Sequence, residues 1–235
     1  MGVRKIKQHV LKLLRSPEFR LIQKELTCFP LKDVINALIP VICRDEEQVR
    51  WFAVSALGVA VAQLANEEME AARIIMRRLL WSLNDESGGI GWGAPEAMAE
   101  IMSCHEGLAE EYIHMLLSYM RPDGEDLYQE GNFLEHERLQ QGLMWAAGRM
   151  AQSRRQLALT KGMDQDLPPY LASSDATVRG LAVRALGLLE QAVSLDEQLR
   201  ALTEDNSRIR LYEDGNIKTV AVADLAMQAV ERLKK

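Results

Sequence analysis

The chain has few aromatic residues, few cysteines and no long uninterrupted apolar run. Aromatic side chains make up 6% of its 235 residues, whereas 48% of the residues are hydrophobic. The apolar positions are therefore filled mainly by Leu, Ala, Val, Ile and Met, a composition that favours packed helices over sheets. No apolar run is long enough to cross a bilayer, and the N-terminus lacks the apolar centre of a secretory signal. We therefore expect a cytoplasmic protein without a transmembrane segment.

Cysteine and positive charge are also limited. Cys28, Cys43 and Cys104 are odd in number and lack the spacing of a metal site, so we expect buried thiols and no disulfide framework. The formal net charge is −6, which argues against a protein that holds phosphate backbones with clustered Lys and Arg. We expect no cofactor, no bound metal and no nucleic-acid partner.

Residues 1–24 have the opposite charge from the rest of the chain. Glu18 is their only acidic residue, whereas Lys and Arg are frequent. The apolar residues of this segment recur at helical spacing and are Ile6, Val10, Leu13 and Leu14. The pattern predicts a basic amphipathic helix, either as a solvated end cap or as a contact for an anionic partner or membrane surface.

An internal repeat organises the chain. Residues 49–58 and 178–187 are identical at seven of ten positions. Each copy follows an apolar segment, so the predicted unit is a pair of antiparallel helices, and such units must stack to bury their apolar faces. The shared pattern Val-Arg-x-x-Ala-Val-x-Ala-Leu-Gly resembles the second helix of HEAT repeats of the phycobilisome-lyase (PBS lyase) type. The segments 81–96 and 131–135 also resemble a functionally uncharacterised bacterial branch of these proteins.

The resemblance implies an all-α fold of the HEAT-like, armadillo-type α-solenoid class, forming a single domain over 1–235. About six helix pairs are expected, at residues 3–28, 31–65, 66–104, 106–152, 154–191 and 194–235. Within the last pair, residues 208–220 alternate polar and apolar side chains around Asp214 and Gly215. This alternation predicts one small β-hairpin near the C-terminus, either as a clasp over the final helix pair or as an edge for a partner peptide.

Three turns between paired helices are long, at residues 84–92, 121–135 and 205–218. Equivalent turns of a solenoid lie along one edge, so we expect the first two to touch. Between Arg121 and Arg138 there are six acidic residues and neither Lys nor Arg. The sequence therefore predicts an acidic, tryptophan-containing groove at residues 84–96 and 121–138.

This groove is the candidate binding site of a non-enzymatic binding or scaffold protein. Indole rings supply anchor area, glycines permit unusual backbone conformations, and carboxylates attract a basic or hydrogen-bond-donating partner. The candidate residues are Trp81, Asn84, Asp85, Glu86, Gly88, Gly89, Gly91, Trp92, Glu96, Glu135, Arg138, Gln141 and Trp145. The expected partner is a protein or peptide, or else a small molecule. A purely structural glycine turn at 84–96 is the alternative.

Three classes of HEAT-fold enzyme are weaker alternatives, and we assign no catalytic residue. The dipeptides at 105–106 and 136–137 are His-Glu pairs similar to those of di-iron hydroxylases, but that family uses four pairs on facing helices. Trp81, Asp85, Trp92 and Trp145 resemble the residue types of HEAT-like DNA glycosylases, whose duplex substrate an acidic groove would repel. The only support for a tetrapyrrole lyase-like role is the generic repeat pattern that the chain shares with phycobilisome lyases.

Overall fold

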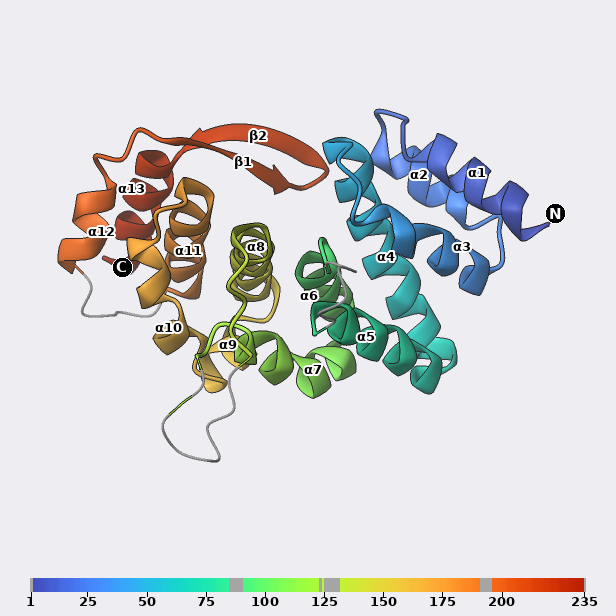
Figure 1. The fold of residues 1–235 in the computed structure, drawn as a ribbon, viewed down its shortest axis with the longest axis horizontal. Coiled ribbons are helices and arrows are strands. Elements are labelled where there is room, and N and C mark those ends of the chain that lie inside the picture. The colour runs from blue at the N-terminus through green and yellow to red at the C-terminus, as the bar shows by residue number, and fades with distance from the viewer. Residues whose placement is uncertain (1, 85–90, 123, 125–131, 191–195, 235) are drawn as a thin grey trace. The chain divides into compact units, whose positions relative to one another are not determined.

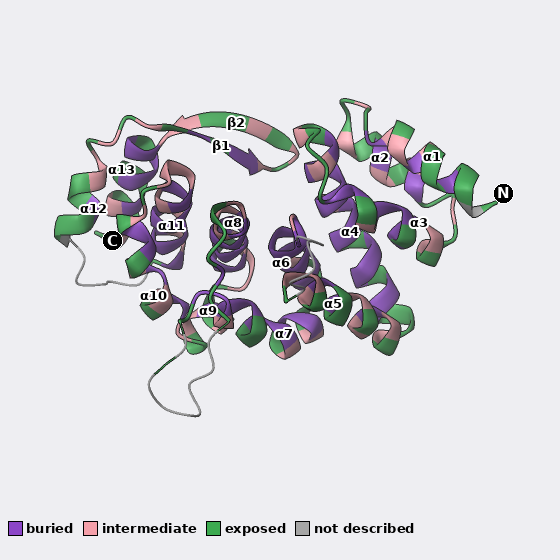
Figure 2. Ribbon diagram, viewed as in Figure 1, coloured by how far each residue is buried: buried purple, intermediate pink, exposed green. Residues whose placement is uncertain are grey.

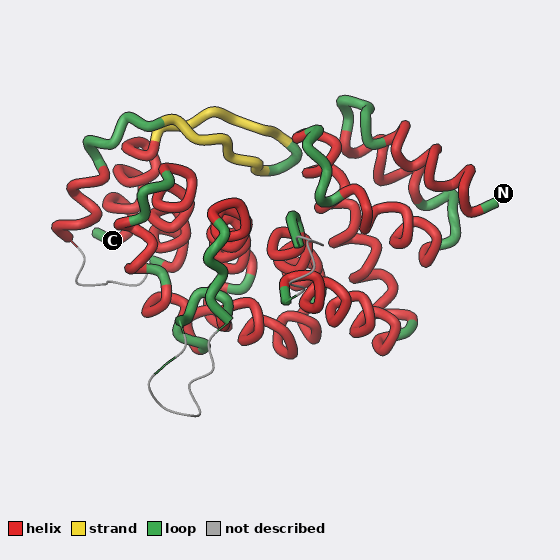
Figure 3. The backbone as a smooth tube through the Cα atoms, viewed as in Figure 1, coloured by secondary structure: helices red, strands yellow, loops and turns green. Residues whose placement is uncertain are grey.

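The computed structural model describes residues 2–84, 91–122, 124, 132–190 and 196–234 (Figure 1). Within these ranges the regular secondary structure is helical apart from one two-stranded hairpin, and loops and turns connect the elements (Figure 3). The predicted all-α class with a small C-terminal hairpin is therefore confirmed. The chain divides into two compact units, Met1–Leu108 with Asp214–Asn216, and Ala109–Glu213 with Ile217–Lys235. A single domain over 1–235 stays a prediction.

The first unit is a succession of helices. They are α1 (Val3–Leu13), α2 (Phe19–Leu26), α3 (Leu31–Leu38), the 3₁₀ helix η1 (Ile39–Val41), α4 (Glu47–Glu67), α5 (Met69–Leu83), α6 (Ala94–Cys104) and the start of α7 (Glu106–Ser118). The helix α4 packs against α3, α5 and α6. Both α4 and α6 are buried over most of their length (Figure 2). These two second helices therefore form the centre of the first unit.

The second unit continues from α7 to the C-terminal helix. Its further elements are α8 (Glu137–Ser153), α9 (Arg155–Thr160), α10 (Met163–Asp166), the 3₁₀ helix η2 (Pro168–Ala172), α11 (Ala176–Leu189), α12 (Asp196–Leu202), β1 (Arg208–Glu213), β2 (Asn216–Ala221) and α13 (Val222–Leu233). The helix α11 is central here, since α8, α13, η2 and β1 all pack against it.

The helix α4 is long and apolar enough to span a membrane by length and composition, the one such helix among the described residues. This helix corrects the expectation that no apolar run is long enough to cross a bilayer. In the structure 72% of its most apolar window is buried. Its Ala, Val and Leu side chains pack against neighbouring helices of the unit.

The predicted amphipathic helix at the N-terminus is α1. Ile6, Val10 and Leu14 are buried, and the helix packs against α3. Its described basic side chains, such as Lys5 and Lys12, are exposed. Because α3 packs against its apolar face, α1 has the arrangement of an end cap. Contact with an anionic partner through its exposed basic side chains stays a prediction.

The glycine shared by the two repeat copies marks a close approach of successive second helices. A Cβ built on Gly58 of α4 would lie 2.9 Å from Cβ of Glu100 on α6, and one built on Gly187 of α11 would lie 2.7 Å from Cα of Ala229 on α13. Real Cβ atoms do not approach other heavy atoms this closely. The glycines therefore let equivalent helices of neighbouring repeats pack backbone to backbone.

We expect Gly187→Ala to destabilise the protein by about 1 kcal/mol. Overpacking against the backbone of α13 costs about 1–3 kcal/mol, which outweighs the roughly 1 kcal/mol that Ala gains over Gly inside a helix. Gly107→Ala in α7 is the matched control, since its Cβ would meet side-chain atoms, Met69 Cε at 3.2 Å and His105 Cε1 at 3.3 Å, in place of backbone. Urea unfolding should show Gly107→Ala nearly as stable as the wild type. Equal losses at both sites would contradict the packing argument.

A ladder of polar contacts joins neighbouring repeats in the second unit. Arg179 Nε donates to Asp205 Oδ2 at 2.6 Å, and Arg179 Nη1 donates to the Ser174 carbonyl at 2.8 Å. One repeat earlier, Gln141 Nε2 donates to Asp175 Oδ2 at 2.9 Å, while Asp175 Oδ1 caps α11 by accepting from the Val178 N–H. Arg179 therefore connects the turn before α11 with the segment that follows α12.

Arg50, the equivalent arginine of the first repeat copy, has different neighbours among the described residues. Arg50 Cζ lies 5.1 Å from the centre of the Trp51 ring, a cation–π contact. In the second copy Gly180 stands in the place of Trp51, so Arg179 has no adjacent ring. Identical register therefore does not give the two arginines the same contacts.

The predicted hairpin is β1 and β2. Asp214 and Gly215 at its turn have φ values of 50° and 78°, as a two-residue turn between antiparallel strands requires. Trp145 of α8 donates its indole N–H to the Tyr212 carbonyl at 2.9 Å, and the two rings lie 6.3 Å apart. The hairpin is thus attached to α8 as well as packed on α11. Its role as a clasp over the final helix pair stays a prediction.

The expectation that the three cysteines are buried is wrong. Cys28, Cys43 and Cys104 form no disulfide, but all three are exposed and not buried as predicted. Each lies at or near the end of a helix, where fewer neighbouring side chains cover it than in the middle.

Candidate functional site

The turn between α5 and α6 is tightly built where the structure describes it. A Cβ on Gly91 would lie 2.8 Å from the Ser82 carbonyl oxygen. Gly93 has a φ of 82°, and its carbonyl accepts the Ala97 N–H in the first turn of α6. Pro95 occupies this first turn, where its missing N–H costs little. Four of the candidate residues, Asp85, Glu86, Gly88 and Gly89, lie outside the described residues.

The two tryptophans that flank this turn differ in exposure. Trp81, near the end of α5, is 80% exposed, whereas Trp92 is half-buried. Ile74 is 55% exposed and precedes Trp81 by seven residues, so both lie on one face of α5. Asn84 is also exposed, and its N–H donates to the Trp81 carbonyl at 3.2 Å. The accessible part of the candidate site in the first unit is therefore Trp81 with its neighbours on α5.

Two carboxylates are buried on α6. Glu96 is 5% exposed and Glu100 is 8% exposed. Ser103 Oγ donates to Glu100 Oε2 at 3.3 Å. Sequence reasoning selected Glu96 but missed Glu100, although their separation by four residues on an otherwise apolar helix places both on one face. Their burial places these two carboxylates on the packed face of α6 and not on an exposed acidic rim.

The candidate residues of the second unit also divide by exposure. Glu135 is exposed and Arg138 is half-buried. Gln141 belongs to the polar ladder, and Trp145 is buried beneath the hairpin, so both have structural partners. The expected contact between the 84–92 and 121–135 turns stays a prediction, because the central residues of both turns lie outside the described ranges.

Both His-Glu dipeptides lie at helix N-termini. His105 Nδ1 accepts the Leu108 N–H at the start of α7, and His136 Nδ1 accepts the Arg138 N–H at the start of α8, each at 3.2 Å. The imidazole rings thus satisfy backbone donors that a helix N-terminus leaves unpaired. No group of three or more His, Cys, Asp or Glu side chains in the described part of the chain has a metal-binding arrangement.

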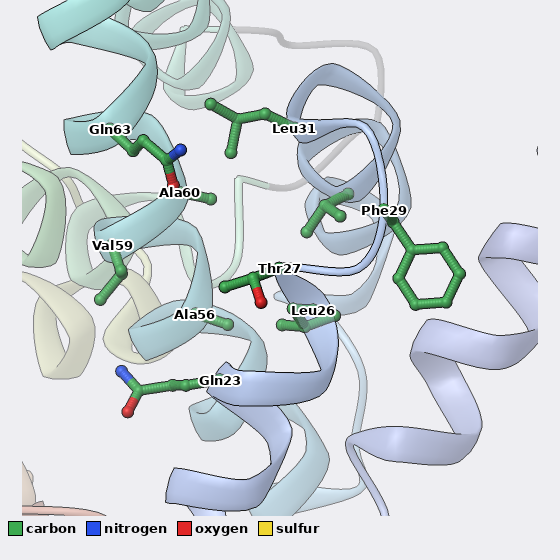
Figure 4. A pocket seen from close by; sticks show the side chains of 10 residues that line it. Gln23, Leu26, Thr27, Phe29, Leu31, Ala56, Val59, Ala60 and Gln63 are labelled. Atoms are coloured by element: carbon green, nitrogen blue, oxygen red, sulfur yellow. The ribbon is translucent and has the colours of Figure 1, made fainter.

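A small apolar pocket lies between α2 and α4 of the first unit (Figure 4). Leu26, Val34 and Ala60 contribute to its lining, and the amides of Gln23 and Gln63 extend from α2 and α4. The Phe29 ring points away from α4 and lies beside the His9 ring, tilted by 52°, with centroids 5.1 Å apart. The volume is about 90 Å³, well below the roughly 300–1,000 Å³ of small-molecule pockets. A pocket of this size suits one apolar side chain of a partner.

No protein-family model and no curated protein matches the chain. Solved structures of engineered repeat proteins are similar to it over nearly their whole length. One engineered protein from a structural genomics consortium shares 17% identity at a TM-score of 0.53, with 100% of this chain and 97% of that chain covered. A second shares 15% identity at a TM-score of 0.54, with 100% and 99% covered.

A designed armadillo repeat protein in complex with the peptide (KR)4 is also similar. It shares 16% identity at a TM-score of 0.52, with 96% of this chain and 98% of that chain covered. These likenesses concern the fold alone, since the identities are low. Together with the helix pairs and the hairpin, they show that the chain has an armadillo-type α-solenoid repeat fold.

Proposed function

We propose that the chain is a non-enzymatic binding or scaffold protein of the cytoplasm that recognises a protein or peptide through the acidic, tryptophan-containing groove at residues 84–96 and 121–138. The observation that carries this proposal is the 80% exposure of Trp81. Burying a whole indole side chain removes about 150–250 Å² from water, worth on the order of 4 kcal/mol or more. A fold that leaves this area exposed on α5 keeps it available for a partner.

The surroundings of Trp81 support a protein partner over a small molecule. Ile74 extends the same helix face and borders a depression between α3, α4 and α5 that also includes Lys32 and Glu68. Exposed apolar residues spaced by seven on a helix are typical of surfaces that bind another helix or an extended peptide. Trp is also among the residues most enriched at the energetic centre of interfaces.

Charge points to a basic partner. The net charge of the chain is −6, and the candidate groove contributes Asp85, Glu86 and the exposed Glu135. The similar designed armadillo protein was solved with (KR)4, a basic peptide. A HEAT-like domain of the PBS lyase type remains the more specific assignment that we propose from the two repeat copies.

Trp81→Ala should weaken the binding of a basic octapeptide, (KR)4, by at least about tenfold, the loss typical of an interface hot spot. The melting temperature should stay close to that of the wild type, because an 80% exposed ring contributes little to the folded core. Fluorescence polarisation of the labelled peptide at low salt gives the affinity, and circular dichroism gives the melting temperature.

Met227→Ala is the matched control, since Met227 is an apolar residue of α13 that is 51% exposed. It should bind (KR)4 as the wild type does, and an acidic octapeptide, (DE)4, should bind neither protein. The proposal is wrong if (KR)4 binds to Trp81→Ala as tightly as to the wild type, or if (DE)4 binds equally well.

A further inference from the structure

A second cavity lies in the second unit, where the hairpin, α11 and α13 meet. Its volume is about 300 Å³, at the lower end of the range for small-molecule pockets. At roughly 30 Å³ per atom, close to the share of one water molecule in the liquid, it has room for a ligand of about ten non-hydrogen atoms. Leu188, Leu211, Val220 and Leu225 supply apolar lining.

The polar lining of this cavity has an excess of positive charge. Arg184, Lys218 and Arg232 face it together with one carboxylate, Glu213. Arg184 Nη2 lies 2.7 Å from Glu213 Oε1, and Lys218 Nζ lies 3.5 Å from Glu213 Oε2. Burial raises the pKa of Glu213, but the hydrogen bonds and charges of Arg184 and Lys218 lower it more, so the pKa stays below its ordinary value. Glu213 is therefore ionised at neutral pH and balances one of three cations.

This excess contrasts with the acidity of the whole chain. Arg184 is held by Glu213 and has a largely buried side chain, whereas Lys218 and Arg232 are exposed at the edge of the cavity. Cations placed beside an apolar lining fit a ligand that has an anionic head and an apolar body, because each part then meets a complementary surface.

We propose that this cavity binds a small amphipathic anion, a carboxylate carried on an apolar chain, with Lys218 and Arg232 contacting the carboxylate and the leucine and valine side chains enclosing the chain. The proposal is independent of the proposed partner groove, because the two sites have no residue in common.

Isothermal titration calorimetry with octanoate, octanol and acetate tests the proposal. Octanoate should bind with a stoichiometry of one per chain. Octanol, which lacks the charge, and acetate, which lacks the chain, should each bind at least about tenfold more weakly. Saturable binding of octanoate that octanol equals would overturn the proposal, as would the absence of octanoate binding.

Two exposed cations provide the variants. Lys218→Gln and Arg232→Gln should each weaken octanoate binding by about tenfold, the usual effect of losing a hydrogen bond to a charged group, and should leave the melting temperature unchanged. Arg208→Gln is the control, since Arg208 is an exposed residue of β1 outside the cavity lining. If both variants bound octanoate as tightly as Arg208→Gln, the charged lining would have no role in binding and the proposal would fail.

Discussion

Gly93→Ala is expected to destabilise the protein by about 3 kcal/mol or more. Gly93 has a φ of 82°, where a side chain costs about 1–3 kcal/mol. A Cβ there would also overlap the carbonyl oxygen of Ile42 and lie 2.9 Å from its carbonyl carbon. Backbone atoms cannot move aside without shifting η1, so overpacking adds about 1–3 kcal/mol. The sum is a large part of a typical stability of about 5–15 kcal/mol.

Gly162→Ala separates the two contributions. Gly162 has the same φ of 82°, but the nearest described atom to its added Cβ is Arg121 Nη2 at 3.8 Å. This variant should lose only the conformational cost, about 1 kcal/mol. Thermal unfolding followed by circular dichroism measures both. Equal losses in the two variants would show that the Ile42 contact is not a real constraint on the α5–α6 turn.

The second helices and the hairpin could be predicted from sequence because their determinants are local. The shared glycine, the apolar spacing and the Asp214-Gly215 turn are all contained in short segments. The first helix of the fifth pair shows the limit. The structure divides it into α9, α10 and η2, because Gly162 adopts a left-handed conformation and η2 begins at Pro168.

The candidate site was harder to predict because exposure depends on distant residues. The sequence pattern around Trp81 and Trp145 does not show which of the two is buried. In the structure the hairpin residue Tyr212 accepts a hydrogen bond from Trp145 and covers it. That contact joins residues 67 positions apart. The cavity beneath the hairpin was missed for the same reason, since Arg184, Lys218 and Arg232 come together only after α11, β2 and α13 have packed.

Arg179→Gln should cost about 2 kcal/mol of stability at pH 7. The hydrogen bond from Arg179, with smaller contributions from the Ser207 side chain and N–H, lowers the pKa of Asp205 from 3.8 to about 2. Because the folded pKa lies below the unfolded value, the pair stabilises the protein above about pH 4, and this contribution is lost as the pH falls towards about 2. A shift of this size corresponds to about 2 kcal/mol.

The stability difference between wild type and Arg179→Gln, measured by urea unfolding, should therefore shrink towards zero between pH 4 and pH 2. Arg155→Gln is the matched control, because Arg155 pairs with Glu190 in the same unit but both side chains are about half exposed. Exposed pairs contribute about 0–1 kcal/mol, so this variant should lose little at any pH. A loss in Arg179→Gln that is the same at pH 7 and pH 2 would mean that packing of the Arg179 side chain, and not its pairing with Asp205, stabilises the junction between these repeats.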